Sequence, residues 1–338
     1  MYAFRFAPMS TQRKELVAAA DALIAMTETA LKQLIVMFNR IAIGGLFVDY
    51  SRVPSVTPEF TKVRTWLAEL GILFDLDIQK LKSSTPAYEK MLAIFLEDSN
   101  SYTKSVFGMS SEEMVAARND QEKMAQIRER GAEAKTKFAD GTLDPLKMME
   151  LSLRMSTNAT RMCACQLREI ENVDAYAVMS YEFSWLEQDD PRMTQHDVVK
   201  ISLGALPVPV DDTPWEQIVE YRNDPDTKGS FLIIKQCLSE LARGSFTLSQ
   251  IEETLEYLLN QFRSNLETHS INTTTMGLVT YVVTKPEFLE MLASAGRDFG
   301  TRALFSVEHQ KLGLLEGESA SAGSEVAYLM QVNSFSQG

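Results

Sequence analysis

Histidine and cysteine, the side chains that most often hold metal ions, are scarce in this chain of 338 residues, which has three of each. The histidines, His196, His269 and His309, show no metal-binding spacing, so we expect each to be structural. Cys163 and Cys165 stand two positions apart on an expected helix, where they point in different directions and cannot chelate one ion. The sequence therefore predicts no metal site of the usual kinds and no cofactor.

The motifs of common enzyme classes are also absent. There is no phosphate-binding loop with its lysine, no glycine-rich dinucleotide fingerprint, no nucleophile elbow and no set of kinase motifs. These absences favour a protein that is not an enzyme.

Long apolar runs are absent as well. Charged residues break the most apolar stretch, residues 16–48, into pieces well short of the roughly 20 residues that span a bilayer. Residues 1–15 contain no apolar core of an export signal. An odd number of cysteines fits free thiols in a reducing compartment, so the expected location is the cytoplasm.

Negative charge is in excess: 46 acidic residues face 33 basic ones, for a net charge of −13. Such a field repels phosphate backbones, which disfavours nucleic acid as a partner for the surface as a whole. Hydrophobic residues make up 45% and charged residues 23% of the chain, the usage of a globular protein.

The first 85 residues are expected to alternate between helix and strand. Apolar spacing predicts a helix over residues 11–31 and a buried strand over 34–43, where a continued helix is the alternative. A helix over 57–70 ends at Gly71, which suits the left-handed position after a helix. Residues 72–75 then form a second strand. Strand, helix and strand in this order predict a parallel crossover unit.

A long helical region is expected over residues 85–170. Ser110 and Glu113 have the spacing of a capping box. Asp144 followed by Pro145 is typical of a helix start.

Strands and helices alternate again beyond residue 170. Strands are expected over 176–183 and 198–203, and the prolines of residues 206–210 require an extended linker. The elements expected after this linker are four helices and a terminal strand, over residues 213–224, 231–242, 247–266, 287–295 and 326–332. Residues 273–284 fit either helix or strand.

These elements predict an α+β protein that is predominantly α-helical, with a small sheet in the N-terminal part and a helical C-terminal part. We divide the chain into a helical extension over residues 1–32, a mixed domain with long helices over 33–205, and a mainly helical domain over 206–338 that begins with the proline-rich linker.

Acidic residues follow the expected strands. Asp75 and Asp77 come directly after the strand at 72–75, and Asp49 follows the first strand. Carboxylates at the carboxyl ends of parallel strands can hold a divalent cation, so these three are the candidates for a metal-dependent hydrolase. Solvated acids where a strand ends are the alternative.

Three arginines recur every seven residues on the expected helix after Asp144. Arg154, Arg161 and Arg168 lie near one stripe, with Asn158 between the first two. This stripe is a candidate surface for an anion or nucleic acid. Solvated arginines, or ion pairs with neighbouring helices, are the alternative.

One segment resembles a family of uncharacterised bacterial cytoplasmic proteins. It reads Leu206-Pro-Val-Pro-x-Asp-x-Thr-Pro-Trp-Glu216, and Tyr221-Arg222-Asn-Asp224 follows it. Weaker matches cover residues 38–43, 70–74 and 323–328, so the resemblance extends over most of the chain from about residue 33. It implies a bacterial cytoplasmic protein and transfers no activity. Within the segment, Thr213, Pro214, Trp215, Glu216 and Arg222 suggest a capped helix that docks on its neighbours, with a structural role.

The sequence thus favours a non-enzymatic interaction or regulatory component of a bacterial cytoplasmic assembly. Long amphipathic helices and 17 methionines suit adaptable contact surfaces, so we expect the partner to be a second copy or another protein. The alternatives are the metal-dependent hydrolase and the anion- or nucleic-acid-binding module. A role in antiviral defence is a further hypothesis, which a gene position beside nucleases or ATPases would support.

Overall fold

A computed structural model describes residues 15–21, 27–44, 57–76, 86–117, 120–179, 194–203, 206–225, 227, 233–234, 248–276, 279–283, 305–314 and 328–330. The helices are α2 (Glu28–Met37), α3 (Pro58–Glu69), α4 (Pro86–Phe107), α5 (Ser111–Ala116), α6 (Gln121–Ala139), α7 (Pro145–Ile170), α9 (Trp215–Asn223) and α11 (Leu248–Thr268). The strands are β1 (Leu16–Ala20), β2 (Arg40–Gly44), β3 (Leu73–Leu76), β4 (Asp174–Met179), β5 (Thr194–Leu203), β6 (Leu206–Pro209), β7 (Thr273–Met276), β8 (Val279–Val283), β9 (Phe305–Leu314) and β10 (Tyr328–Met330). The expected class, α+β with helix predominating and a small sheet in the N-terminal part, is confirmed.

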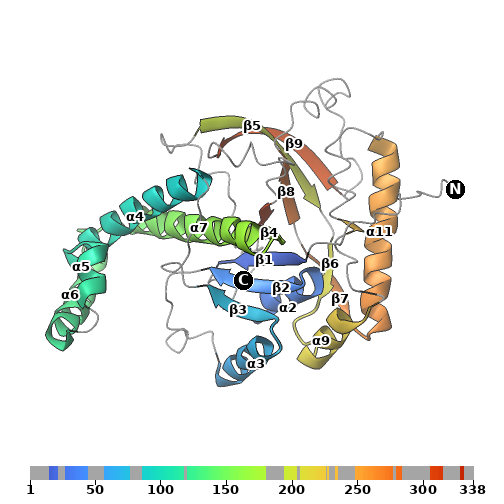
Figure 1. Cartoon of the computed structure of the whole chain (residues 1–338), viewed down its shortest axis with the longest axis horizontal. Helices are drawn as coiled ribbons and strands as arrows, with labels where there is room; N and C mark the ends of the chain where they lie inside the picture. Colours follow the sequence, from blue (N-terminus) through green and yellow to red (C-terminus); the bar gives the residue numbers. More distant parts are fainter. Residues whose placement is uncertain are drawn as a thin grey trace.

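A five-stranded parallel sheet, in the order β10-β4-β1-β2-β3, lies at the centre of the molecule (Figure 1). Its middle strand is β1, in which Ala18 pairs with Ile41 of β2 and with Tyr176 of β4. Since neighbouring strands run parallel, each connection between them must cross over the sheet. The crossover unit expected from strand, helix and strand is confirmed for β2, α3 and β3.

The helix predicted over residues 11–31 is wrong over residues 16–20, which form the strand β1, and right over residues 28–31, which begin α2. All five residues of β1 are buried. A parallel strand covered by helices on both faces loses the alternation of polar and apolar residues that identifies a half-buried strand. An alanine-rich run of this kind also has high helix propensity, so the sequence pattern misidentified it.

The strand predicted over residues 34–43 is wrong in its first half. Leu34–Met37 is the last turn of α2, and the strand β2 begins only at Arg40. Every residue from Ala30 to Met37 is buried, so this part of α2 shows no polar face that would mark its helical period.

Helices cover both faces of the parallel sheet. On one face, a core cluster joins the strands to α2, α3, α9 and α11 through residues such as Leu31, Leu67 and Phe262. On the other face, α4 and α7 pack against the sheet through Met91, Met162 and their neighbours. The first cluster contains residues from all three segments into which we divided the sequence, so these segments share one core.

The helical arm, which we define as residues 96–153, extends from the sheet to one side (Figure 1). The outer parts of α4 and α7 form it together with α5 and α6, and Val106, Ala134, Met148 and Leu151 make its own small core. The expected capping box of Ser110 and Glu113 is confirmed at the start of α5. Asp144 caps α7, with Pro145 at its first position, also as expected.

The C-terminal half adds strands to the expected helices. β5 lies between β8 and β9 in an antiparallel sheet, and β6 pairs with β7. Residues 273–276 and 279–283 are therefore strand, and the proline-rich linker is an extended strand. The helices expected over 231–242 and 287–295 lie outside the described residues, apart from residues 233–234.

Candidate functional site

The acidic turn predicted as a metal site is only partly within the described residues. Asp75 lies on the edge strand β3, opposite Ile43, with an exposed side chain. Asp49 and Asp77 lie outside the described residues. Over the described part of the chain, no group of three or more His, Cys, Asp or Glu side chains could hold a metal ion. The metal-dependent hydrolase therefore gains no support from the geometry.

The arginine stripe is not an open surface: Arg161 is buried, and Arg154 and Arg168 are each partly buried. Asn158 and Arg161 are buried. The guanidinium of Arg154 binds Asp98 of α4, with 3.0 Å between Nη2 and Oδ1. Arg168 donates from Nε to the carbonyl oxygen of Ala175 at 2.7 Å. Arg154 and Arg168 therefore join α7 to α4 and β4, and the ion pair with Asp98 is of the kind expected as the alternative to an anion-binding face.

Asp21, a buried acid at the carboxyl end of the middle strand, was not among the site residues predicted from the sequence. Its N–H donates to the carbonyl oxygen of Val178 at 3.2 Å, so its backbone extends the pairing of β1 with β4. A short apolar run that ends in an acid, residues 16–21, is typical of a buried strand with a polar end. Because residues 11–31 were predicted to be one helix, this pattern was not recognised.

Cys163 lies deep in the core beneath β2, as expected for an inert thiol. Burial raises the pKa of this thiol to about 12, and the neighbouring Cys165 adds to the effect. The folded state holds the thiol proton more tightly than the unfolded state does. The protonated thiol of Cys163 therefore contributes fully to the free energy of unfolding below about pH 9, and this contribution is lost as the pH rises towards 12.

We expect iodoacetamide at pH 8 to leave Cys163 unmodified in the folded protein, since the thiolate is the reactive form and the site is closed to reagent. In urea, Cys163 and Cys165 are both expected to be alkylated, which serves as the control. Peptide mass spectrometry measures the two residues separately. Rapid alkylation of Cys163 without urea would contradict its burial.

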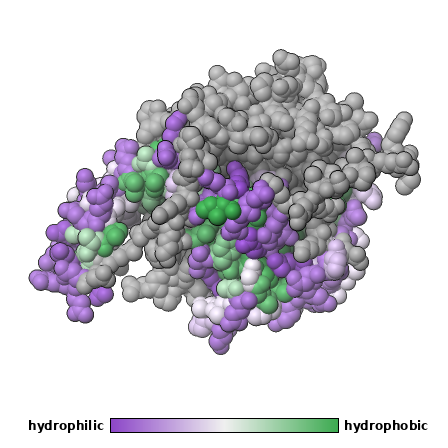
Figure 2. Space-filling model, in the orientation of Figure 1, coloured by the Kyte–Doolittle hydropathy of each residue, from purple (hydrophilic) through white to green (hydrophobic). Residues whose placement is uncertain are grey.

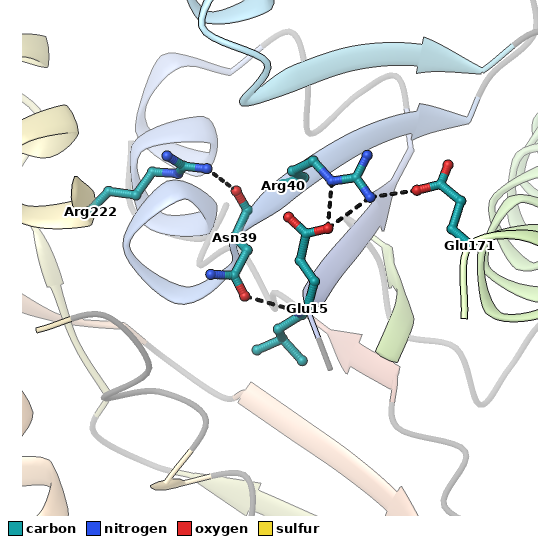
Figure 3. A network of polar contacts seen from close by, with 6 residues as sticks. Glu15, Asn39, Arg40, Glu171 and Arg222 are labelled. Atoms are coloured by element: carbon teal, nitrogen blue, oxygen red, sulfur yellow. Dashed lines mark hydrogen bonds and ion pairs between the residues drawn. The ribbon is translucent and has the colours of Figure 1, made fainter. Parts of the chain in front are cut away.

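The amino-edge network consists of Glu15, Asn39, Arg40, Glu171 and Arg222, at the end of the sheet where β1 and β2 begin (Figure 3). Arg40 binds Glu15 through Nε at 2.9 Å and Glu171 through Nη2 at 2.5 Å. The side chain of Asn39 accepts from the N–H of Leu16 at 2.8 Å, and its carbonyl oxygen accepts from Arg222. The network therefore joins β1, β2, the end of α7 and α9.

The two arginines of this network differ in electrostatic environment. Burial acts to lower the pKa of Arg40, but its hydrogen bonds to Glu171 and Glu15 outweigh burial and the pKa is raised. Burial lowers the pKa of Arg222, and the charge of Glu15 opposes this only in part. Arg40 is thus held by paired carboxylates, whereas Arg222 is held mainly by neutral oxygens.

The segment with the family resemblance forms a docking elbow, residues 211–215, between β6 and α9. Trp215 donates from Nε1 to Glu28 of α2 at 2.9 Å and stacks on Phe60 of α3, with ring centroids 6.3 Å apart. The ammonium of the buried Lys32 lies 5.1 Å from the centroid of the Trp215 ring and 3.2 Å from Glu28.

The capping predicted for α9 is wrong in detail. Its N-cap is Pro214, so the helix starts one residue later than expected and has no capping bond from Thr213 or capping box with Glu216. The Thr213 hydroxyl is buried and has no hydrogen-bond partner among the described residues. Asp211 of the elbow instead turns towards α2, where it accepts from Thr29 at 2.7 Å and from Lys32 through its backbone carbonyl oxygen.

An apolar stripe lies on the outer half of α7, formed by Leu146, Met149 and Leu153. Leu146 is 71% and Met149 50% exposed, while Leu153 is partly buried. Their spacing of three and four residues puts them on one side of the helix. On the face of the molecule seen in Figure 2, the surface of the arm is largely hydrophilic, and a few separate hydrophobic residues lie among the hydrophilic ones.

Comparisons with protein-family models, with curated proteins and with solved structures found no match. Among the described helices, none is both long enough and apolar enough to cross a membrane. What the structure defines is therefore a class: an α+β protein with a central parallel sheet and a projecting helical arm.

Proposed function

We propose that this chain is a non-enzymatic interaction protein of a bacterial cytoplasmic assembly, and that its helical arm binds a second copy of the chain. The observation that carries the proposal is the apolar stripe on α7, where Leu146 and Met149 are largely exposed on a projecting element. Large exposed apolar side chains that are neighbours on one helix are typical of protein contacts.

The spacing of the stripe supports a second copy as the partner. Leu146, Met149 and Leu153 follow the three-and-four pattern by which paired helices interlock their side chains. A two-fold symmetric contact uses the same patch on both copies, so this stripe can supply both halves of the interface. The arm has a core of its own, which holds α7 in place while its outer side stays open to a partner.

We expect light scattering to give a mass of about twice the 38.0 kDa of one chain. The double variant Leu146→Glu/Met149→Glu is expected to return the mass to that of one chain, because it places charges in the apolar contact. Both positions are exposed, so the variant should fold normally.

Ile170→Glu is the matched control, since Ile170 is 60% exposed on the same helix but lies at its other end, outside the arm. This variant is expected to keep the mass of the wild type. A wild-type chain that stays at the mass of one copy at high concentration would refute self-association through the arm. If Ile170→Glu lowers the mass measured by light scattering as much as the double variant does, the contact between copies does not depend on the apolar stripe.

A further inference from the structure

The helix α7 belongs both to the arm and to the sheet. Met148 and Leu151 lie in the core of the arm, whereas Met155 and Met162 lie in the core beneath the sheet. Arg154 stands between these two sets and pairs with Asp98 of α4. One continuous helix therefore passes through both cores and connects the arm to the sheet.

The far end of α7 reaches the sheet at the amino-edge network. Glu171, the C-cap residue of α7, pairs with Arg40 at the start of β2. Asn39, which precedes Arg40 in the chain, accepts a hydrogen bond through its backbone carbonyl oxygen from the guanidinium of Arg222 of α9. Two consecutive residues, Asn39 just before β2 and Arg40 at its start, thus contact α9 and the end of α7 respectively (Figure 3).

We propose that the amino-edge network couples the helical arm to α9, so that a partner bound at the arm changes the stability of α9 and of the docking elbow. The identity of the arm's partner rests on the proposed function above, whereas the coupling rests on the contacts of Glu171, Arg40, Asn39 and Arg222. Coupling of this kind requires that a change at the end of α7 alters the free energy of local opening of α9. The coupling can therefore be measured without any partner.

The test is amide hydrogen exchange on the full-length chain carrying Glu171→Gln, a substitution that keeps the shape of the side chain and removes its charge. We expect the amides of residues 215–223 to exchange about two- to fivefold faster, as befits the loss of a partly exposed ion pair. Arg40→Gln, which removes the residue that receives both carboxylates, is expected to act in the same direction.

Glu69→Gln is the matched control, since Glu69 is an exposed acid on α3 and lies outside the amino-edge network. It is expected to leave the exchange of α9 unchanged. Faster exchange confined to the end of α7 would overturn the coupling, and so would an equal increase throughout α11, which would indicate general destabilisation. These readings do not depend on the mass of the protein, so failure of the coupling and failure of self-association are distinguishable.

Discussion

Trp215→Ala is expected to lower the free energy of unfolding by about 3–5 kcal/mol, the range for removal of a large aromatic side chain from a core. The indole joins three elements: it donates to Glu28 of α2, stacks on Phe60 of α3 and begins α9. Its removal also deprives the buried ammonium of Lys32 of an aromatic face. Urea unfolding followed by circular dichroism measures the effect.

Two companion variants separate the contributions of Trp215. Trp215→Phe keeps an aromatic ring beside Phe60 and loses the bond to Glu28, so we expect a cost of about 1–2 kcal/mol. Tyr257→Ala removes an aromatic ring that is 67% exposed on α11 and should cost less than about 0.5 kcal/mol. A loss from Trp215→Ala no larger than that from Tyr257→Ala would show that the elbow does not hold α9 in place.

Gly44→Ala is expected to cost about 2–3 kcal/mol, at the upper end of the range for overpacking. A methyl group at Gly44 would lie 2.3 Å from Sγ and 3.0 Å from Cβ of Cys163, and 3.5 Å from the carbonyl oxygen of Ala159. A change of the Cys163 rotamer can move Sγ away but not Cβ, so α7 must also shift slightly away from the end of β2.

Gly141→Ala is the comparison for Gly44→Ala. Gly141 has a φ of +78° and open space around it, so an added methyl group meets only backbone strain, which costs about 1 kcal/mol. Combining Gly44→Ala with Cys163→Ala is expected to recover part of the loss, because it removes the closest contact. If Gly44→Ala proves no more costly than Gly141→Ala, then α7 is not seated against the sheet at this point.

The starts of α5 and α7 were predictable from chemical markers in the sequence, whereas the capping of α9 was not. Ser110 with Glu113, and Asp144 with Pro145, satisfy backbone groups through contacts within a few residues, so their pattern is sufficient evidence of the structure. Gly71 likewise adopts the left-handed conformation expected after α3, with a φ of +68°. Local chemistry of this kind does not depend on the rest of the fold.

Features that depend on distant segments were not predictable in the same way. β1 was mistaken for helix because its partners, β2 and β4, are what make it a strand. The arginines on α7 suggested a surface because their burial comes from α4 and from other elements packed around that helix. Trp215 was identified as a docking residue, but its bond to Glu28 joins positions far apart in the sequence and has no local signature.

The place of β1 in the sheet also affects how the protein can be made. Leu16 of β1 pairs with Asp174 of β4, and β4 in turn pairs with Tyr328 of β10. The ribosome therefore releases β1, β2 and β3 long before the strands that complete the sheet. Contacts of such high sequence separation make folding slow, and an exposed strand edge invites association with other chains in the meantime. Until β4 is synthesised, the alanine-rich strand β1 therefore has an open edge on the side that β4 later covers.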